Sequence, residues 1–247
     1  MSSGFGPDEL LDCYREGVFP MGEDADDSRI FIVDPDVRGV IPLDGFHLSR
    51  SLKKIVRSDR FKVTVDTCFT TVMEACAEPT PERPSTWINT PIVNLYAQLH
   101  RRGHAHSVEC WQGDVLVGGL YGVSLGGAFF GESMFSRVSN ASKVALTHLV
   151  ARLIAGGYKL LDTQFMTSHL ASLGAVEMSR DTFQEKLAEA LEVKANFYSV
   201  GAASGSPPSD GDSSVSGDPS SDSESSPSTK GSSMTGGRAV QLITQTS

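Results

Sequence analysis

Residues 142–165 read SKVALTHLVARLIAGGYKLLDTQF, and this stretch decides the fold class. Apolar residues recur at helical spacing through residues 142–154, and the glycine pair at 156–157 then ends the helix, as glycine commonly does just past a helix C-terminus. Residues 159–165 follow as a leucine-containing strand. A long apolar helix that leads directly into a strand predicts a helix packed on an internal strand of a sheet.

The surrounding sequence extends this layout in both directions. Three further strands are expected at residues 106–111, 115–123 and 128–132, and another at 61–65. Further helices are expected at residues 69–77, 90–102 and 179–191. The pattern predicts an α+β fold with a mixed sheet and helices packed on its faces.

The chain is expected to divide near Arg60. Residues 1–60 would form a small N-terminal α/β domain, with a helix at 7–16 and a turn-rich loop at 17–22. Residues 61–200 would form the catalytic domain. Residues 201–247 are rich in Ser, Gly, Asp and Pro and are expected to be a disordered tail, in which the short apolar segment 239–243 is given no role.

Composition narrows the functional classes. The 247 residues carry a net charge of −9, contain no long apolar run and begin without a basic and apolar leader, so a cytoplasmic protein without a membrane span is expected. Four scattered cysteines favour neither disulfides nor zinc. His100 and His104 have helical spacing, but Gly103 interrupts the helix between them, so no metal site is expected.

One segment is basic within this acidic protein. Arg50, Lys53, Lys54 and Arg57 recur at the spacing of one helix face, and residues 50–62 carry a net charge of +5. Such a stripe can contact the phosphates of a nucleic acid. Charge pattern alone favours a solvated helix face that happens to be basic.

Two polar residues lie on the strand that follows the long helix. Asp162 and Gln164 are separated by one residue of a strand and are expected to share one face, about 7 Å apart. A carboxylate and an amide placed in this way could orient an incoming amine and receive its proton. Spacing alone favours a half-exposed strand with polar residues outward. Glu132, at the end of another apolar strand, could bind a cation or cap a turn.

Several blocks together resemble one known family, the leucyl/phenylalanyl-tRNA-protein transferases, from Tyr14 to Phe197. They are YREGVFPM at 14–21, TWI at 86–88, GHAHSVE at 103–109, LVGGLYGV at 116–123, GESMFSR at 131–137, NASK at 140–143, LDTQ at 161–164 and HLASLGA at 169–175. The order of so many blocks is far more specific than any single motif. One departure is the absence of Trp before Asp34, where relatives often carry one.

The resemblance implies a small N-terminal domain and a second domain with the acetyltransferase-superfamily (GNAT-like) fold, working without acetyl-CoA, metal or ATP. It implies transfer of Leu or Phe, and less well Met, from aminoacyl-tRNA to proteins that begin with Arg or Lys, which marks them for degradation. A monomer is the default expectation. Two alternatives stay open: an acetyl-CoA-dependent N-acetyltransferase of the same fold, and a non-catalytic tRNA-binding module.

The resemblance also suggests roles for individual residues. Asp162 and Gln164 look like the catalytic pair of the family, and Glu132 like its acid beside the reacting end of the acceptor. Three residues resemble the wall of the pocket for the transferred side chain: Trp87, Met134 and Phe135. The stripe of Arg50, Lys53, Lys54 and Arg57 looks like the basic helix that contacts the tRNA acceptor arm.

Overall fold

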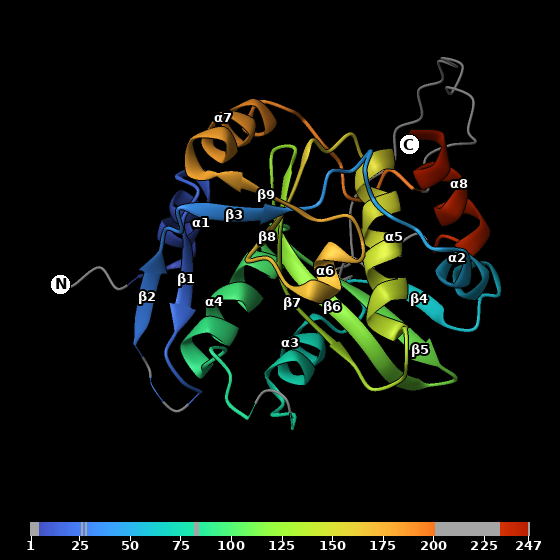
Figure 1. Cartoon of the computed structure of the whole chain (residues 1–247). Coiled ribbons are helices and arrows are strands. Elements are labelled where there is room, and N and C mark those ends of the chain that lie inside the picture. Colours follow the sequence, from blue (N-terminus) through green and yellow to red (C-terminus); the bar gives the residue numbers. More distant parts are fainter. Residues whose placement is uncertain (1–4, 26, 28, 82–83, 201–232, 247) are drawn as a thin grey trace, which may run out of the picture.

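The computed structural model describes residues 5–25, 27, 29–81, 84–200 and 233–246 (Figure 1). Its centre is a seven-stranded sheet with the order β4-β5-β6-β7-β8-β3-β9. The strands are β3 (Val37–Val40), β4 (Lys62–Val65), β5 (Ala105–Gln112), β6 (Val115–Leu125), β7 (Ala128–Ser136), β8 (Leu160–Gln164) and β9 (Val176–Ser179). Only β7 and β8 are parallel neighbours, and the other pairs are antiparallel. The expectation of a mixed sheet flanked by helices is confirmed.

Helices cover both faces of this sheet (Figure 1). One face carries α5 (Ala141–Ala155), α2 (Arg50–Arg57) and α8 (Gly236–Thr246), and the other carries α1 (Pro7–Arg15), α3 (Phe69–Ala77), α4 (Thr90–Arg101) and α7 (Arg180–Leu191). A hydrophobic core lies on each face of the sheet. Successive side chains of β7 point into different cores: Phe129 packs on the α5 side and Phe130 on the α4 side. Within the described part of the chain, every helix is too short or too polar to cross a lipid bilayer.

Helix α5 and strand β8 lie where the sequence predicts them. Helix α5 ends at Ala155, and Gly156 is its C-cap. Gly157 follows with a φ of +79°, a left-handed conformation that glycine adopts without strain. Strand β8 lies inside the sheet between β7 and β3. The buried side chains of α5 extend around most of its circumference, which explains why its sequence is apolar over so many positions.

Five elements of the structure were missed because they are short. The expected loop at 17–22 contains β1 (Phe19–Gly22), which pairs with β2 (Ile30–Val33) in a separate two-stranded sheet. Strands β3 and β9 and the one-turn helix α6 (Ser168–Ala171) each span four residues. Segments of this length show no clear periodicity, and their partners are distant in the sequence.

The expected boundary near Arg60 is not marked by a gap in the packing. Strand β3 precedes Arg60 and yet lies in the large sheet between β8 and β9. Both hydrophobic cores contain residues from each side of Arg60. A division into a domain at 1–60 and a domain at 61–200 therefore remains a prediction about independent folding.

The C-terminal residues differ from the expectation of a disordered tail at 201–247. Residues 201–232 lie outside the described residues, but α8 is a helix that buries Ala239, Val240 and Ile243 against α5 and α2. The expectation was wrong for residues 233–246. The apolar residues of 239–243 recur at helical spacing, and this pattern was too short to stand out beside the polar sequence before it.

Candidate active site

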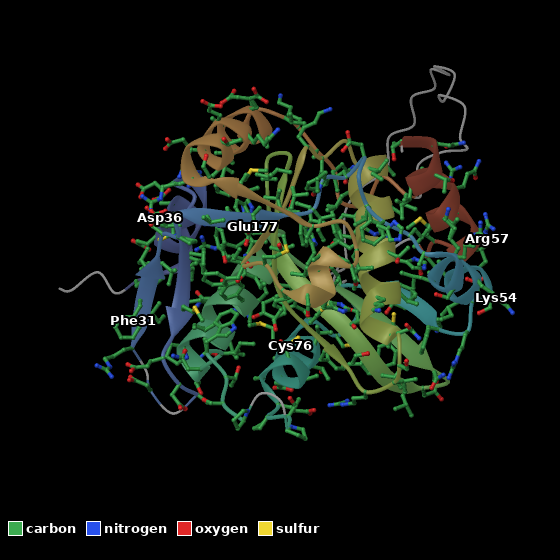
Figure 2. All side chains as sticks on the ribbon, viewed as in Figure 1. Phe31, Asp36, Lys54, Arg57, Cys76 and Glu177 are labelled. Atoms are coloured by element: carbon green, nitrogen blue, oxygen red, sulfur yellow. The ribbon has the colours of Figure 1, made fainter. Side chains whose placement is uncertain are left out.

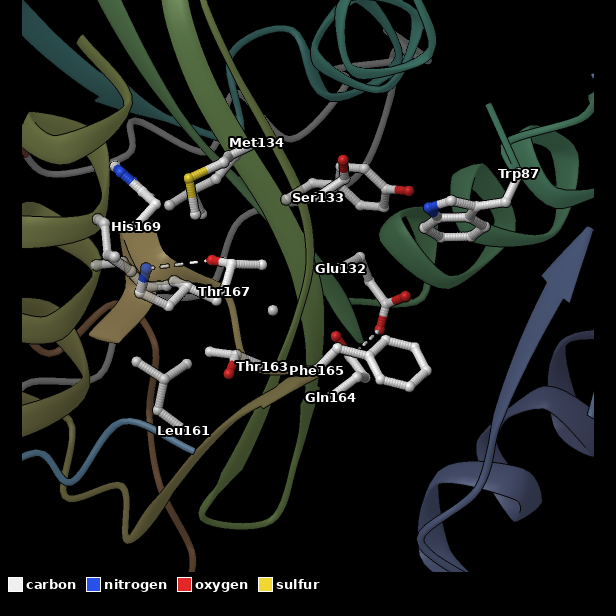
Figure 3. A pocket seen from close by; sticks show the side chains of 16 residues that line it. Trp87, Glu132, Ser133, Met134, Leu161, Thr163, Gln164, Phe165, Thr167 and His169 are labelled. Carbon is white, nitrogen blue, oxygen red and sulfur yellow. Dashed lines mark hydrogen bonds between the residues drawn. The ribbon is translucent and has the colours of Figure 1, made fainter. Parts of the chain in front are cut away.

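A pocket opens where the two parallel strands separate. Residues Ala128–Phe130 of β7 pair with residues Leu160–Asp162 of β8. Beyond these residues the two strands no longer pair with each other. The resulting cavity has a volume of about 350 Å³, a size suited to a small ligand group (Figure 3). Its apolar lining comes from the elements around it: Leu120, Met134, Leu146, Leu149, Leu161 and Leu170.

A bulge in β7 decides which of its side chains enter the pocket. Gly122 of β6 faces Gly131, but the preceding Tyr121 faces Ser133, so Glu132 is an extra residue in the ladder. Met134 lines the pocket beyond this bulge, whereas Phe135 is buried in the α4-side core. Neighbouring residues of a strand point to opposite faces, so Met134 and Phe135 could not both form the pocket wall. The structure places the expected Trp87 and Met134 there but not Phe135.

Glu132 lies at the centre of a partly buried polar network. Its carboxylate accepts hydrogen bonds from the hydroxyls of Tyr14 (2.7 Å) and Tyr96 (3.0 Å), and these two hydroxyls also contact each other. Burial raises the pKa of Glu132 to about 7, with the two tyrosine hydrogen bonds opposing the rise. Burial and the nearby carboxylate also raise the pKa of both phenols well above their usual value. Tyr14 and Tyr96 therefore remain hydrogen-bond donors.

Gln164 links this network to Asp162. Its side-chain amide donates to Glu132 (3.3 Å), and its backbone N–H donates to the carboxylate of Asp162 (3.0 Å). The φ of Gln164 is +56°, which costs of order 1 kcal/mol or more for a residue other than glycine. The Asp162 carboxylate stabilises this strained conformation and so orients the Gln164 side chain. The three residues expected at the reaction centre thus lie together, although only Glu132 and Gln164 line the pocket.

Asp162 is not on a half-exposed strand, as spacing alone favoured. Its side chain is fully buried and forms a two-pronged ion pair with Arg38, with N–O distances of 2.9 and 2.8 Å. Burial raises the pKa of Asp162, and the guanidinium opposes that rise by stabilising the ionised form. A buried carboxylate on an internal strand requires a cationic partner, and this requirement could have prompted a search for one.

Arg38 was missed by the sequence analysis. Its guanidinium lies between the rings of Phe19 and Phe183, at 4.7 and 4.4 Å from their centroids, and also donates to the backbone carbonyl of Gly17 (2.7 Å). Several segments therefore converge on one charge that is almost completely buried. The arrangement anchors the left-handed turn at Gln164 to the N-terminal segment.

The pocket has two different ends. Trp87 lies near Glu132 at one end, while Met134, Leu161 and His169 lie at the other (Figure 3). Two buried polar atoms on the lining have no hydrogen-bond partner among the described residues, the hydroxyl of Thr163 and Nε2 of His169. Burial and Lys143 lower the pKa of His169, which favours the neutral ring. A ligand in this pocket would therefore meet a mainly apolar wall with two unsatisfied polar atoms.

The four basic residues project from one short helix, α2. Arg50, Lys54 and Arg57 are exposed and Lys53 is half-buried, while Leu52 and Val56 face the core. None of the four forms an ion pair with a residue that the structure describes. Helix α5 lies between α2 and the pocket, and Lys54 and Arg57 lie at the edge of the molecule (Figure 2). The stripe is thus a surface separate from the pocket.

Two features noted in the sequence, the histidines and the missing tryptophan, can be compared with the structure. Among the described residues, no group of three or more His, Cys, Asp or Glu is arranged to hold a metal ion. The segment that lacks the tryptophan of many relatives forms β2, where Phe31 and Ile32 are exposed and do not line the pocket.

Comparisons with known proteins agree on one family. The profile of the family described as Leucyl/phenylalanyl-tRNA protein transferase matches residues 40–188. A leucyl/phenylalanyl-tRNA–protein transferase of Hyphomonas neptunium is 56% identical over 260 residues, covering 100% of both chains. Proteins of the same name from Maricaulis maris and Phenylobacterium zucineum are 62% and 59% identical, covering 78% and 84% of this chain and 90% and 93% of their own. The chain belongs to the leucyl/phenylalanyl-tRNA protein transferase family.

Proposed function

We propose that this enzyme transfers Leu or Phe, and less well Met, from aminoacyl-tRNA to the N-terminal amine of proteins that begin with Arg or Lys. Membership of the family supports aminoacyl transfer from tRNA to protein, over the acetyl-CoA-dependent and non-catalytic alternatives. The choice of donor and acceptor residues, and the resulting degradation signal, follow from the family resemblance. The observation that carries the proposal is the largely apolar pocket with Glu132 and Gln164 at one end.

In the proposed reaction, the side chain of the transferred amino acid occupies the apolar part of the pocket. Its ester carbonyl then lies toward Glu132 and Gln164. The neutral amine of the acceptor attacks this carbonyl, a C–N bond forms, the ester C–O bond breaks, and the proton lost by the amine is returned to the departing ribose oxygen. No energy source besides the ester is required.

The side chains around the amine would have different roles in the reaction. The Nε2 group of Gln164 donates to Glu132, which leaves its carbonyl oxygen to accept a hydrogen bond from the amine. Ionised Glu132 would attract the cationic N-terminal residue of the acceptor. Asp162 does not line the pocket and would act by orienting Gln164, so we assign it a positioning role.

The decisive test of the function mixes the intact protein with labelled Leu-tRNA and a peptide that begins with Arg. Transfer of label to this peptide, and not to a matched peptide that begins with Ala, is expected. Phe-tRNA and Met-tRNA in the same assay would give the order of preference. No transfer above background would overturn the proposed reaction. Tight binding of acetyl-CoA would instead favour an acetyltransferase.

We propose that the basic stripe on α2 contacts the phosphates of the tRNA acceptor arm. Replacing Lys54 and Arg57 together by Gln is expected to raise the KM for Leu-tRNA. It should also reduce the slope of log affinity against log salt by roughly 0.7–0.9 for each phosphate that the variant no longer neutralises. Lys194→Gln removes one exposed charge elsewhere and is the control. Equal salt slopes in the α2 variant and the parent would argue against this assignment.

The unpartnered hydroxyl of Thr163 is expected to influence which amino acid is preferred. Leu and Phe side chains cannot accept its hydrogen bond, whereas the sulfur of Met can do so weakly. Thr163→Val keeps the shape and removes the hydroxyl, so transfer of Leu relative to Met is expected to rise by about threefold. A competition assay with both aminoacyl-tRNAs in one tube measures the ratio. An unchanged ratio would show that this hydroxyl has no part in selection.

The fold of residues 61–200 and the oligomeric state are also part of this proposal. The mixed sheet with helices on both faces supports a GNAT-like fold for residues 61–200. A monomer is proposed, and light scattering on the intact protein measures the mass directly.

A further inference from the structure

Helix α8 packs against the helix that carries the basic stripe. Its buried residues Ala239, Val240 and Ile243 belong to the same hydrophobic core as Leu52 and Val56 of α2. Figure 1 shows α8 beside α2 on the outer side of α5. This helix lies beyond residues 40–188, which the family profile matches. Its contacts therefore lie outside the segment that the family profile matches.

Helix α2 depends on its neighbours for stability. It has eight residues, and helices of this length are not stable in water without packing. Its cations also repel one another, because Arg50 with Lys54 and Lys53 with Arg57 are like-charge pairs at the i,i+4 spacing. The position of the stripe is therefore set by what packs on the apolar side of α2, which is α5 and α8.

The contact is tightest where α8 begins. The backbone N–H of Gly236 donates to the side chain of Asp59 at 2.8 Å, just after the end of α2. A Cβ atom added at Gly236 would overlap the backbone carbonyl of Val56, so only glycine fits there. Near the other end of α8, Ile243 and Thr244 border the same cavity as Lys53. Both ends of α8 thus lie near α2 or the segment that leads into it.

The charge of α8 is compatible with a neighbouring nucleic acid. It contains one cation, Arg238, and no acidic residue, although the chain as a whole is acidic. A helix without carboxylates does not compete with phosphates for the cations of α2.

We infer that α8 is a positioning element for tRNA binding, which holds α2 so that its four cations match the spacing of the acceptor-arm phosphates. The inference rests on the proposed role of α2 in tRNA binding. Gly236 is the residue that sets the distance between the two helices. The aminoacyl pocket is lined by residues of other elements, so α8 should affect tRNA binding without changing the chemical step.

The test compares two substitutions in adjacent glycines of the full-length protein. Gly236→Ala forces α8 away from Val56, whereas Gly237→Ala meets nothing within 4 Å. Both changes add the same methyl group and the same helix propensity. For Gly236→Ala, the KM for Leu-tRNA is expected to rise roughly fivefold, the equivalent of about one ordinary hydrogen bond. The kcat at saturating tRNA and the KM for the acceptor peptide should stay at parental values, as should all constants of Gly237→Ala.

Other outcomes separate this inference from the proposed function. Equal KM values for the two glycine variants would overturn the positioning role of α8, as would a fall in kcat at saturating tRNA in Gly236→Ala alone. If Gly236→Ala does not fold, Ile243→Ala with the exposed Gln245→Ala as its control tests the same contact by the same split between KM and kcat. If the Lys54 and Arg57 variant leaves tRNA binding unchanged, the assignment of α2 itself fails, whatever α8 does.

Discussion

Removing either member of the buried Arg38–Asp162 pair alone is expected to destabilise the protein by about 3–5 kcal/mol, because the remaining charge is left without a partner inside the fold. Both side chains are almost completely inaccessible to water and are joined by two hydrogen bonds. Arg38→Met and Asp162→Leu are the single variants. Urea unfolding with a constant slope measures the loss.

The double variant Arg38→Met with Asp162→Leu separates stability from catalysis. Replacing a buried ion pair by apolar residues of similar volume is often neutral for stability, so the double variant should recover most of what each single change loses. Transfer should nevertheless stay at least about a hundredfold below the parent, because the backbone N–H of Gln164 has lost the acceptor that supports its left-handed conformation. Parental transfer by the double variant would contradict the positioning role of Asp162.

Glu132→Gln is expected to reduce kcat/KM for an Arg-starting peptide by about a hundredfold at pH 8, where the parent carboxylate is ionised. The pKa of about 7 predicts that kcat/KM of the parent rises as pH increases through 7. The variant should lack this rise and retain only the dependence that comes from the acceptor amine. A pH profile from 5.5 to 8.5 distinguishes the two, and identical profiles would exclude Glu132 as the titrating group.

The same substitution should change how stability depends on pH. Folding raises the pKa of Glu132 from 4.5 to about 7, so the proton bound to Glu132 stabilises the fold below pH 4.5 and this contribution is lost as pH rises to about 7. The loss is at most about 3 kcal/mol, because Glu132 is only partly buried and lines the pocket. Relative to the parent, Glu132→Gln should therefore become more stable over this interval and level off above it. A constant difference between pH 4.5 and 7 would contradict the raised pKa.

The sequence predicted α5 and β8 but not β3 and β9. This difference shows which elements a sequence can reveal. Helix α5 has fifteen residues with apolar side chains around most of its surface, and it ends at two glycines. Strands β3 and β9 have four residues each and are held by pairing with β8 and with each other. Local periodicity signals the first kind of element, whereas the second depends on partners that are distant in the chain.

The candidate site shows the same division. Asp162, Gln164 and Glu132 could be named from the sequence because each interrupts or ends an apolar strand within a block that resembles the family. Tyr14, Tyr96 and Arg38 could not be named, because their relevance lies in contacts with residues far along the chain: Tyr14 is 118 residues from Glu132, and Arg38 is 124 residues from Asp162. The bulge that separates Met134 from Phe135 depends likewise on the register of β6 against β7.

By itself, the sequence determined the family, the long helix and strand at the centre of the fold, and the polar residues that we propose act in aminoacyl transfer. The tertiary structure alone decided that Asp162 faces Arg38 instead of the pocket, that Glu132 accepts hydrogen bonds from two phenols, and that the C-terminal helix packs against α2. The physical reason is that residue type and spacing encode local conformation and hydrophobicity. The protonation and orientation of a buried group depend on neighbours that are brought close only when the whole chain has folded.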